Sequence, residues 1–154
     1  MSTFTVQHTC GHESKHAYTG PEEALQQRKE WLQGRPCQAC WRAQESTLAA
    51  DQSQELNLPE LEGSEQDKPW AAVIRLKVVE HNRDYVKKLV GSKKVAAEEE
   101  TMRTAIITSA NEALRELESQ RDAGWWIANR FDALTFVKAK VVKAVTPILD
   151  ARSE

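Results

Sequence analysis

Near its N-terminus the chain reads Pro36-Cys37-Gln38-Ala39-Cys40-Trp41, in which two cysteines are separated by two residues. This spacing lets a tight turn bring both thiolates to one metal ion. The third cysteine lies in the stretch His8-Thr9-Cys10-Gly11-His12, and three of the four histidines also fall within the first 40 residues. Because zinc prefers four tetrahedral ligands from cysteine and histidine, the sequence predicts one structural zinc ion (Zn2+) bound by Cys10, Cys37, Cys40 and a histidine.

More than one histidine could supply the fourth zinc ligand. His12, which follows Gly11, is the preferred candidate, because a metal-binding turn often needs a residue at positive φ and glycine adopts it readily. His8 is the alternative, since His8, Cys10 and His12 would share one face of an extended strand. If the chain turns at Gly11, the three side chains no longer share one face. His16 is the third candidate.

Other interpretations of the cysteines are a redox pair, inert buried thiols and a catalytic zinc site. The surrounding pattern lacks the strand and helix alternation of a thioredoxin fold, and an odd number of cysteines argues against a disulfide framework. A catalytic zinc ion keeps one position open for water, so an enzyme would use Cys10 or the zinc-bound water, with Glu13 as the base. The chain carries no H-E-x-x-H motif, no Ser-His-Asp order and no cofactor fingerprint, so we expect a protein without catalytic activity.

The residues around the cysteines are expected to form a small module of the zinc-ribbon or treble-clef type. Alternating β-branched residues predict a strand over 3–9, and residues 17–19 can return as a second strand after a turn over 12–15. Pro21 starts a predicted helix that stops at Gly34. A second helix opens at the C-x-x-C pair and is expected to continue through Leu48.

The second half of the chain is predicted to be helical. Apolar residues at three- and four-residue spacing predict helices over 66–90 and 94–120, followed by a third helix from Trp125 through Ile148. Short connections make these helices antiparallel neighbours. The fold class is therefore mainly α (α+β overall), with a zinc module followed by an antiparallel three-helix bundle.

The predicted organisation has three parts. Residues 1–50 form the zinc-binding module, residues 51–65 form an acidic linker, and residues 66–154 form the helical bundle. The linker is inferred from its excess of acidic residues and its proline and glycine.

Composition and charge narrow the class of protein. A length of 154 residues suits one domain with a small appendage, and 40% hydrophobic residues suffice for a core. No apolar run approaches the roughly 20 residues that a membrane helix needs. The N-terminal residues Met1-Ser2-Thr3-Phe4 lack the features of a secretory signal. We therefore expect a cytoplasmic protein without a membrane partner.

Positive charge is concentrated in two places. Residues 74–94 hold seven basic residues against two acidic ones, and residues 138–143 hold three lysines. Basic faces around 75–94 and 138–143 could bind the phosphate backbone of a nucleic acid. Alternatively, the basic helix complements the acidic segment 95–121. A net charge of −2 argues against a surface that is basic throughout.

Short blocks in both halves of the chain carry a resemblance to known proteins. The blocks are Thr9-Cys10-Gly11-His12, the region from Arg28 to Trp31, Pro36-Cys37 through Cys40-Trp41-Arg42-Ala43, Leu58 to Glu65, Trp70-Ala71 with Ile74-Arg75, and Ala123 to Arg130. They resemble an uncharacterised group of small bacterial, phage and plasmid proteins with an N-terminal zinc-ribbon-like head. The resemblance implies metal binding and an origin on a mobile element, and it suggests a regulator or anti-defence factor that acts on a host protein.

The same blocks supply residues that could contact a partner, because tryptophan and arginine dominate the binding energy of many interfaces. The alternative is that they form a helix cap packed against a Trp-rich seam of the bundle. We expect a macromolecular partner, with protein ahead of nucleic acid, and a homodimer through the Trp-rich helices is a further alternative. The partner-binding candidates from these blocks are Trp70, Arg75, Trp125, Trp126, Asn129 and Arg130, and the basic face adds Lys87 and Lys88.

Overall fold

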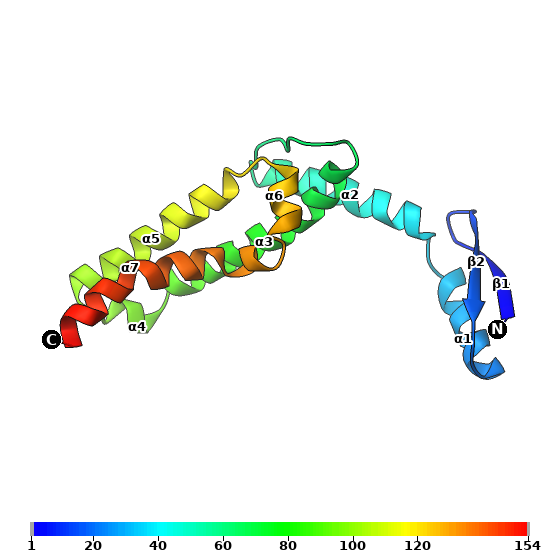
Figure 1. Ribbon diagram of the computed structural model, residues 1–154, viewed down its shortest axis with the longest axis horizontal. Coiled ribbons are helices and arrows are strands. Elements are labelled where there is room, and N and C mark those ends of the chain that lie inside the picture. The colour runs from blue at the N-terminus through cyan, green and yellow to red at the C-terminus, as the bar shows by residue number, and fades with distance from the viewer. Residues whose placement is uncertain (1, 154) are drawn as a thin grey trace. The chain divides into compact units, whose positions relative to one another are not determined.

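The computed structural model describes residues 2–153 (Figure 1). The chain is mainly helical and carries a small antiparallel sheet at its N-terminal end, so the predicted fold class is confirmed at this level. It forms two compact units, one up to Leu48 and one from Ala49 onward. We call them the N-terminal unit and the helical unit.

The N-terminal unit begins with a β-hairpin. β1 (Ser2–Gln7) pairs antiparallel with β2 (Glu13–Tyr18). The turn between the strands lies over residues 8–12 and not over 12–15 as predicted. As a result, β2 starts earlier than the predicted second strand at 17–19.

Backbone geometry at Gly11 explains where the hairpin turns. Gly11 has a φ of +86°, which residues other than glycine rarely adopt. The His8 amide donates a hydrogen bond to the His12 carbonyl at 2.9 Å, and the Gly11 amide donates to the His8 carbonyl at 2.9 Å. These two bonds close the turn directly around Cys10.

One helix and the first part of a second helix complete the N-terminal unit. α1 (Glu22–Gln33) ends at a glycine as predicted, and α2 (Gln38–Glu55) begins within the C-x-x-C pair. Phe4 and Val6 alternate to one face of β1 and are buried together with Leu32 of α1. This apolar core is small, so it leaves much of the unit's stability to other interactions.

Three long helices make up most of the helical unit. α3 (Asp67–Val90), α5 (Glu100–Glu118) and α7 (Phe136–Ser153) pack against one another, and α5 runs in the direction opposite to the other two (Figure 1). Their contact consists of small and β-branched side chains that fit closely spaced helices. The buried members of this contact are Val86, Ala110, Ala113, Val137 and Val141.

Two of the predicted helices are interrupted. Residues 94–120 form a short helix, α4 (Lys93–Ala96), and then α5. The hydroxyl of Ser92 caps α4 by accepting a hydrogen bond from the Val95 amide. The predicted third helix is divided into α6 (Ala123–Ala128), a 3-10 helix η1 (Asp132–Thr135) and α7.

The buried side chain of Asn82 forms hydrogen bonds with backbone groups at the break before α7. Asn82 is 1% exposed, and its amide nitrogen donates to the carbonyls of Val78 at 2.8 Å and Ala133 at 3.0 Å. Its oxygen accepts a hydrogen bond from the Val137 amide at 3.2 Å. The bonds to Ala133 and Val137 satisfy backbone groups at the junction of η1 and α7 that a continuous helix would pair with each other. The interruption therefore relies on a contact between residues far apart in the sequence.

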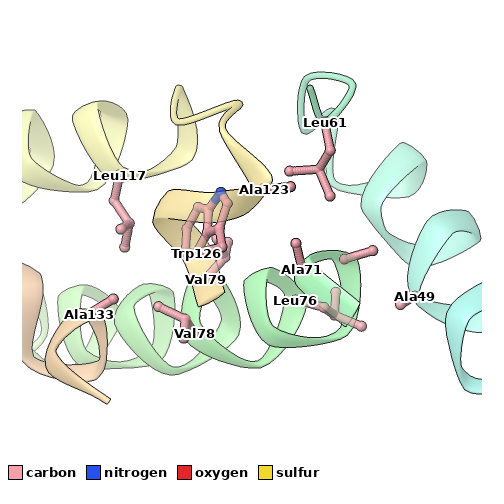
Figure 2. Close-up of a cluster of buried hydrophobic side chains, with 11 residues drawn as sticks. Ala49, Leu61, Ala71, Leu76, Val78, Val79, Leu117, Ala123, Trp126 and Ala133 are labelled. Carbon is pink, nitrogen blue, oxygen red and sulfur yellow. The ribbon is translucent and has the colours of Figure 1, made fainter. Parts of the chain in front are cut away.

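Trp126 of α6 lies in the main core of the helical unit (Figure 2). The side chain is fully buried and faces Val79 of α3, with Leu117 of α5 and Ala123 in the same cluster. Its indole nitrogen donates to the Gln120 carbonyl at 3.0 Å. Trp126 therefore fastens α6 to the core that α3 and α5 share.

The segment predicted as an acidic linker over 51–65 is largely part of the helical unit. α2 continues to Glu55, and Leu61 is buried in the main core. Glu62 pairs with Asp122 in a short parallel bridge. The linker was predicted from the acidic residues of this segment. Its leucines are apolar, and their packing against the main core fixes the position of the segment.

Candidate metal centre

The hairpin and the start of α2 bring the candidate ligands together. The turn around Gly11 carries Cys10 and His12, and the first turn of α2 carries Cys37 and Cys40. The Thr9 amide donates to the carbonyl of Arg35 at 3.1 Å, which ties the hairpin to the residues before α2. Local backbone hydrogen bonds thus hold both halves of the ligand set.

The four donor atoms lie close enough to share one ion. The thiol sulfurs of Cys10, Cys37 and Cys40 and a ring nitrogen of His12 all lie within 4.8 Å of one another. His12 Nδ1 is 3.4 Å from Cys40 Sγ and 3.7 Å from Cys37 Sγ. Tetrahedral zinc with ordinary bond lengths separates such atoms by about 3.6 Å. The group could therefore hold one metal ion, and its thiolate-rich chemistry suits zinc.

Hydrogen bonding shifts the pKa values of two of the thiols in opposite directions. The Cys37 amide donates to Cys10 Sγ at 3.3 Å and, together with the His12 backbone, lowers the pKa of Cys10 to about 6. The pKa of Cys40 is raised to about 11, first by its hydrogen bond with the Cys37 thiol and then by burial. These shifts favour the thiolate form of Cys10 and the protonated form of Cys40.

Acid is expected to weaken zinc binding at this site. Because Cys40 has a pKa of about 11 and Cys10 one of about 6, binding releases at least the Cys40 proton throughout the interval between these values. The apparent affinity should then fall at least about tenfold for each unit by which the pH is lowered, and more steeply once Cys10 is protonated too. Zinc titrations against a chromophoric competing chelator at several pH values check this. An affinity that does not change with pH would contradict thiolate ligation.

His8, the alternative fourth ligand, lies in the interior with its ring directed elsewhere. It is 7% exposed, and its Nδ1 donates to the Leu32 carbonyl at 2.9 Å. Its Nε2 forms a hydrogen bond with the Ser14 hydroxyl, which also bonds to His16 Nε2 at 2.6 Å. His8 thus joins the hairpin to the end of α1, His16 bonds within the hairpin, and His12 is the histidine that lies with the thiols. The chain turns at Gly11, so the strand geometry that favoured His8 does not form.

One partner-binding candidate, Arg75, lies inside the helical unit. Arg75 is 4% exposed, and its guanidinium donates to the Pro59 carbonyl. Arg83 lies two turns further along α3, donates to the Leu56 carbonyl at 3.2 Å and pairs with Glu118. These arginines fasten the segment after α2 to α3. Arg75 is therefore an internal tether and does not present its charge to a partner.

The paired tryptophans also contribute mainly to packing. Trp126 is buried, and the half-buried Trp125 meets it edge-on with ring centroids 5.1 Å apart. Asn129 is half-buried and donates to the Trp125 carbonyl at 2.9 Å. For these three residues the cap-and-seam interpretation fits the structure. Trp70 and Arg130 differ from them, because Trp70 is 51% exposed and Arg130 is partly exposed beside it.

The predicted basic faces are compensated only in part. Lys88 pairs with Asp84 within α3 at 2.8 Å, and Lys140 of α7 pairs with Glu116 of α5 at 3.7 Å. Arg83 pairs with Glu118 of α5, and Arg75 is internal. The remaining lysines of these segments, Lys87 among them, are exposed and have no acidic partner among the described residues. Pairing and burial thus interrupt a phosphate-binding track without removing its charge.

The roles of two residues gave no signal in the sequence. Ser14 links His8 and His16, yet nothing in its neighbourhood marks it. Phe131 falls within the span of the predicted third helix, but it is 73% exposed, because the helix is interrupted between α6 and η1.

No family model, curated protein or solved structure matches the chain. Within residues 2–153, no helix combines the length and the apolar character that crossing a membrane would require.

Proposed function

We propose that this protein is a non-enzymatic zinc-containing binding protein. In this proposal the N-terminal unit is a ribbon-like or treble-clef-like module with one structural zinc ion, and the protein engages a macromolecular partner. The observation that carries the proposal is the grouping of Cys10, His12, Cys37 and Cys40 with their donor atoms within 4.8 Å of one another. Four protein ligands would fill the tetrahedral positions of zinc and leave none for a catalytic water.

The partner is proposed to be a protein before a nucleic acid. The pairing of Lys88 and Lys140 with acidic residues reduces the support for a phosphate-binding face. A role as a mobile-element-encoded regulator or anti-defence factor acting on a host protein rests on the sequence resemblance alone.

Metal analysis of matched histidine variants tests the proposal. We expect about one zinc per chain in the purified wild-type protein, by elemental mass spectrometry, as a single tetrahedral site requires. His12→Ala should lose zinc during dialysis against a weak chelator, because it removes one of the four donors. His8→Gln and His81→Ala should retain it, since neither residue belongs to the group.

Two results would contradict the proposal. One is the absence of metal from protein prepared under reducing conditions. The other is loss of zinc from His8→Gln with full retention in His12→Ala. This result would show that His8, and not His12, is the fourth ligand.

A further inference from the structure

Two exposed aromatic rings flank one arginine on the helical unit. We call Trp70, Arg130 and Phe131 the aromatic–arginine patch. Trp70 is 51% exposed and Phe131 is 73% exposed. The guanidinium carbon of Arg130 lies 5.7 Å from the Trp70 ring centroid and 4.8 Å from that of Phe131. These distances allow the cation to interact with both rings.

The fold holds this patch on fixed elements. Trp70 lies near the start of α3. Arg130 donates to the Ile127 carbonyl at 2.7 Å, and the Ala133 amide donates to the Asn129 carbonyl at 2.8 Å. The corner between α6 and η1 is thereby fastened on both sides of the arginine. The patch is preorganised, which lowers the entropy lost on binding.

Arg130 has no acidic partner among the described residues. No carboxylate of residues 2–153 lies within 4.0 Å of its nitrogens, whereas Arg83, Lys88 and Lys140 each pair with one. A guanidinium of this kind binds a carboxylate through two parallel hydrogen bonds, and the adjoining rings offer apolar contact. The patch therefore presents one uncompensated positive charge between two apolar surfaces.

The surroundings of the patch disfavour a polyanion. The segments that carry it, residues 59–70 and 121–135, contain six acidic residues against three basic ones. A nucleic acid needs a track of cations along its backbone, and these segments do not supply one. A single carboxylate beside an apolar side chain is the chemistry that matches one arginine and two rings.

From this match we infer that the aromatic–arginine patch is a docking site for a protein segment that presents a carboxylate next to an aromatic or long aliphatic side chain. The inference rests on the proposed function, because it names the chemistry of the partner that a binding protein would engage. Trp, Phe and Arg in one cluster also have the composition of an interface hot spot.

Peptide selection on the full, zinc-loaded chain tests the inference. A phage-displayed library of random peptides is selected on the immobilised protein, and a synthetic peptide of the enriched consensus is then the probe for calorimetric titration. We expect the consensus to pair Asp or Glu with a nearby aromatic or aliphatic residue. Trp70→Ala, Arg130→Ala and Phe131→Ala should each weaken the peptide at least about tenfold, as hot-spot truncations do.

The chain supplies a matched control for these variants. Trp31 of α1 is 53% exposed and stacks on Arg35, whose guanidinium carbon lies 3.9 Å from its ring centroid. Trp31→Ala removes the same kind of side chain from the same kind of pair, and it should leave the affinity of the peptide unchanged. Arg130→Glu should reverse the selection, so that Lys or Arg replaces the acidic residue in the consensus.

Several outcomes would overturn the inference. These are no enriched peptide, a consensus without an acidic residue, or equal losses in Trp31→Ala and the patch variants. If an oligothymidylate probe binds and the patch variants lose this binding, the partner of the patch is a nucleic acid. If the protein self-associates and the patch variants do not, the partner is a second copy of this chain. Zinc content is measured in every variant, because loss of zinc binding would refute the proposed function, whereas failed selection on zinc-loaded protein refutes only this inference.

Discussion

Removal of zinc by a chelator is expected to unfold the N-terminal unit and to leave the helical unit folded. The buried core of the N-terminal unit consists of Phe4, Val6 and Leu32. Full burial of such side chains contributes about 1.5–3 kcal/mol each, whereas structural zinc in small domains contributes about 10–16 kcal/mol. Hydrogen exchange read by mass spectrometry should show amides of β1, β2 and α1 losing protection after chelation. Amides of α3, α5 and α7 should keep theirs.

A ligand substitution separates zinc loss from side effects of the chelator. Cys37→Ser should produce the same exchange pattern in the presence of zinc, because it removes one of the grouped donors. Strands that stay protected after zinc removal would show that the hairpin folds without metal, and the structural role of zinc would then be wrong.

Trp126→Ala is expected to destabilise the helical unit strongly without changing the zinc content of the protein. The substitution removes a fully buried indole from the main core and breaks its hydrogen bond to the Gln120 carbonyl. Large-to-small changes of this type lower the free energy of unfolding by about 3–5 kcal/mol. Domains are stable by only about 5–15 kcal/mol, so much of the stability of the unit would be lost. Urea unfolding followed by circular dichroism of the helices measures the loss.

Trp70→Ala is the matched control for this substitution. Trp70 belongs to the same unit but is 51% exposed, so its removal should change the free energy of unfolding by about 0.5 kcal/mol or less. Equal losses in the two variants would contradict the central position of Trp126 in the core.

The grouping of Cys10, His12, Cys37 and Cys40 was the most predictable part of the molecule. Cysteine and histidine in this spacing have few other uses, and the choice between His8 and His12 turned on the conformation of one glycine, Gly11. The helix over 66–90 was predicted within one residue at its start, because its apolar periodicity and the glycine after it are local signals.

The interruptions and the partner-binding residues were less predictable, because they depend on tertiary contacts. The break before α7 is satisfied by Asn82, which lies on a different helix. Arg75, Trp126 and Arg130 have the residue types of an interface, yet the structure buries the first two and leaves the third partly exposed. Residue type alone does not distinguish an internal tether from an exposed contact.

The placement of the ligands has a consequence for how the chain folds during its synthesis. All four lie between Cys10 and Cys40, whereas the main core of the helical unit draws on residues from Ala49 to Ala133. Chains grow from the N-terminus at about 5–20 residues per second, and early units fold first. All four candidate ligands have therefore been synthesised seconds before Trp126 is added to the chain. Under the proposed function, zinc available to the nascent chain would let the first unit fold before the second one forms.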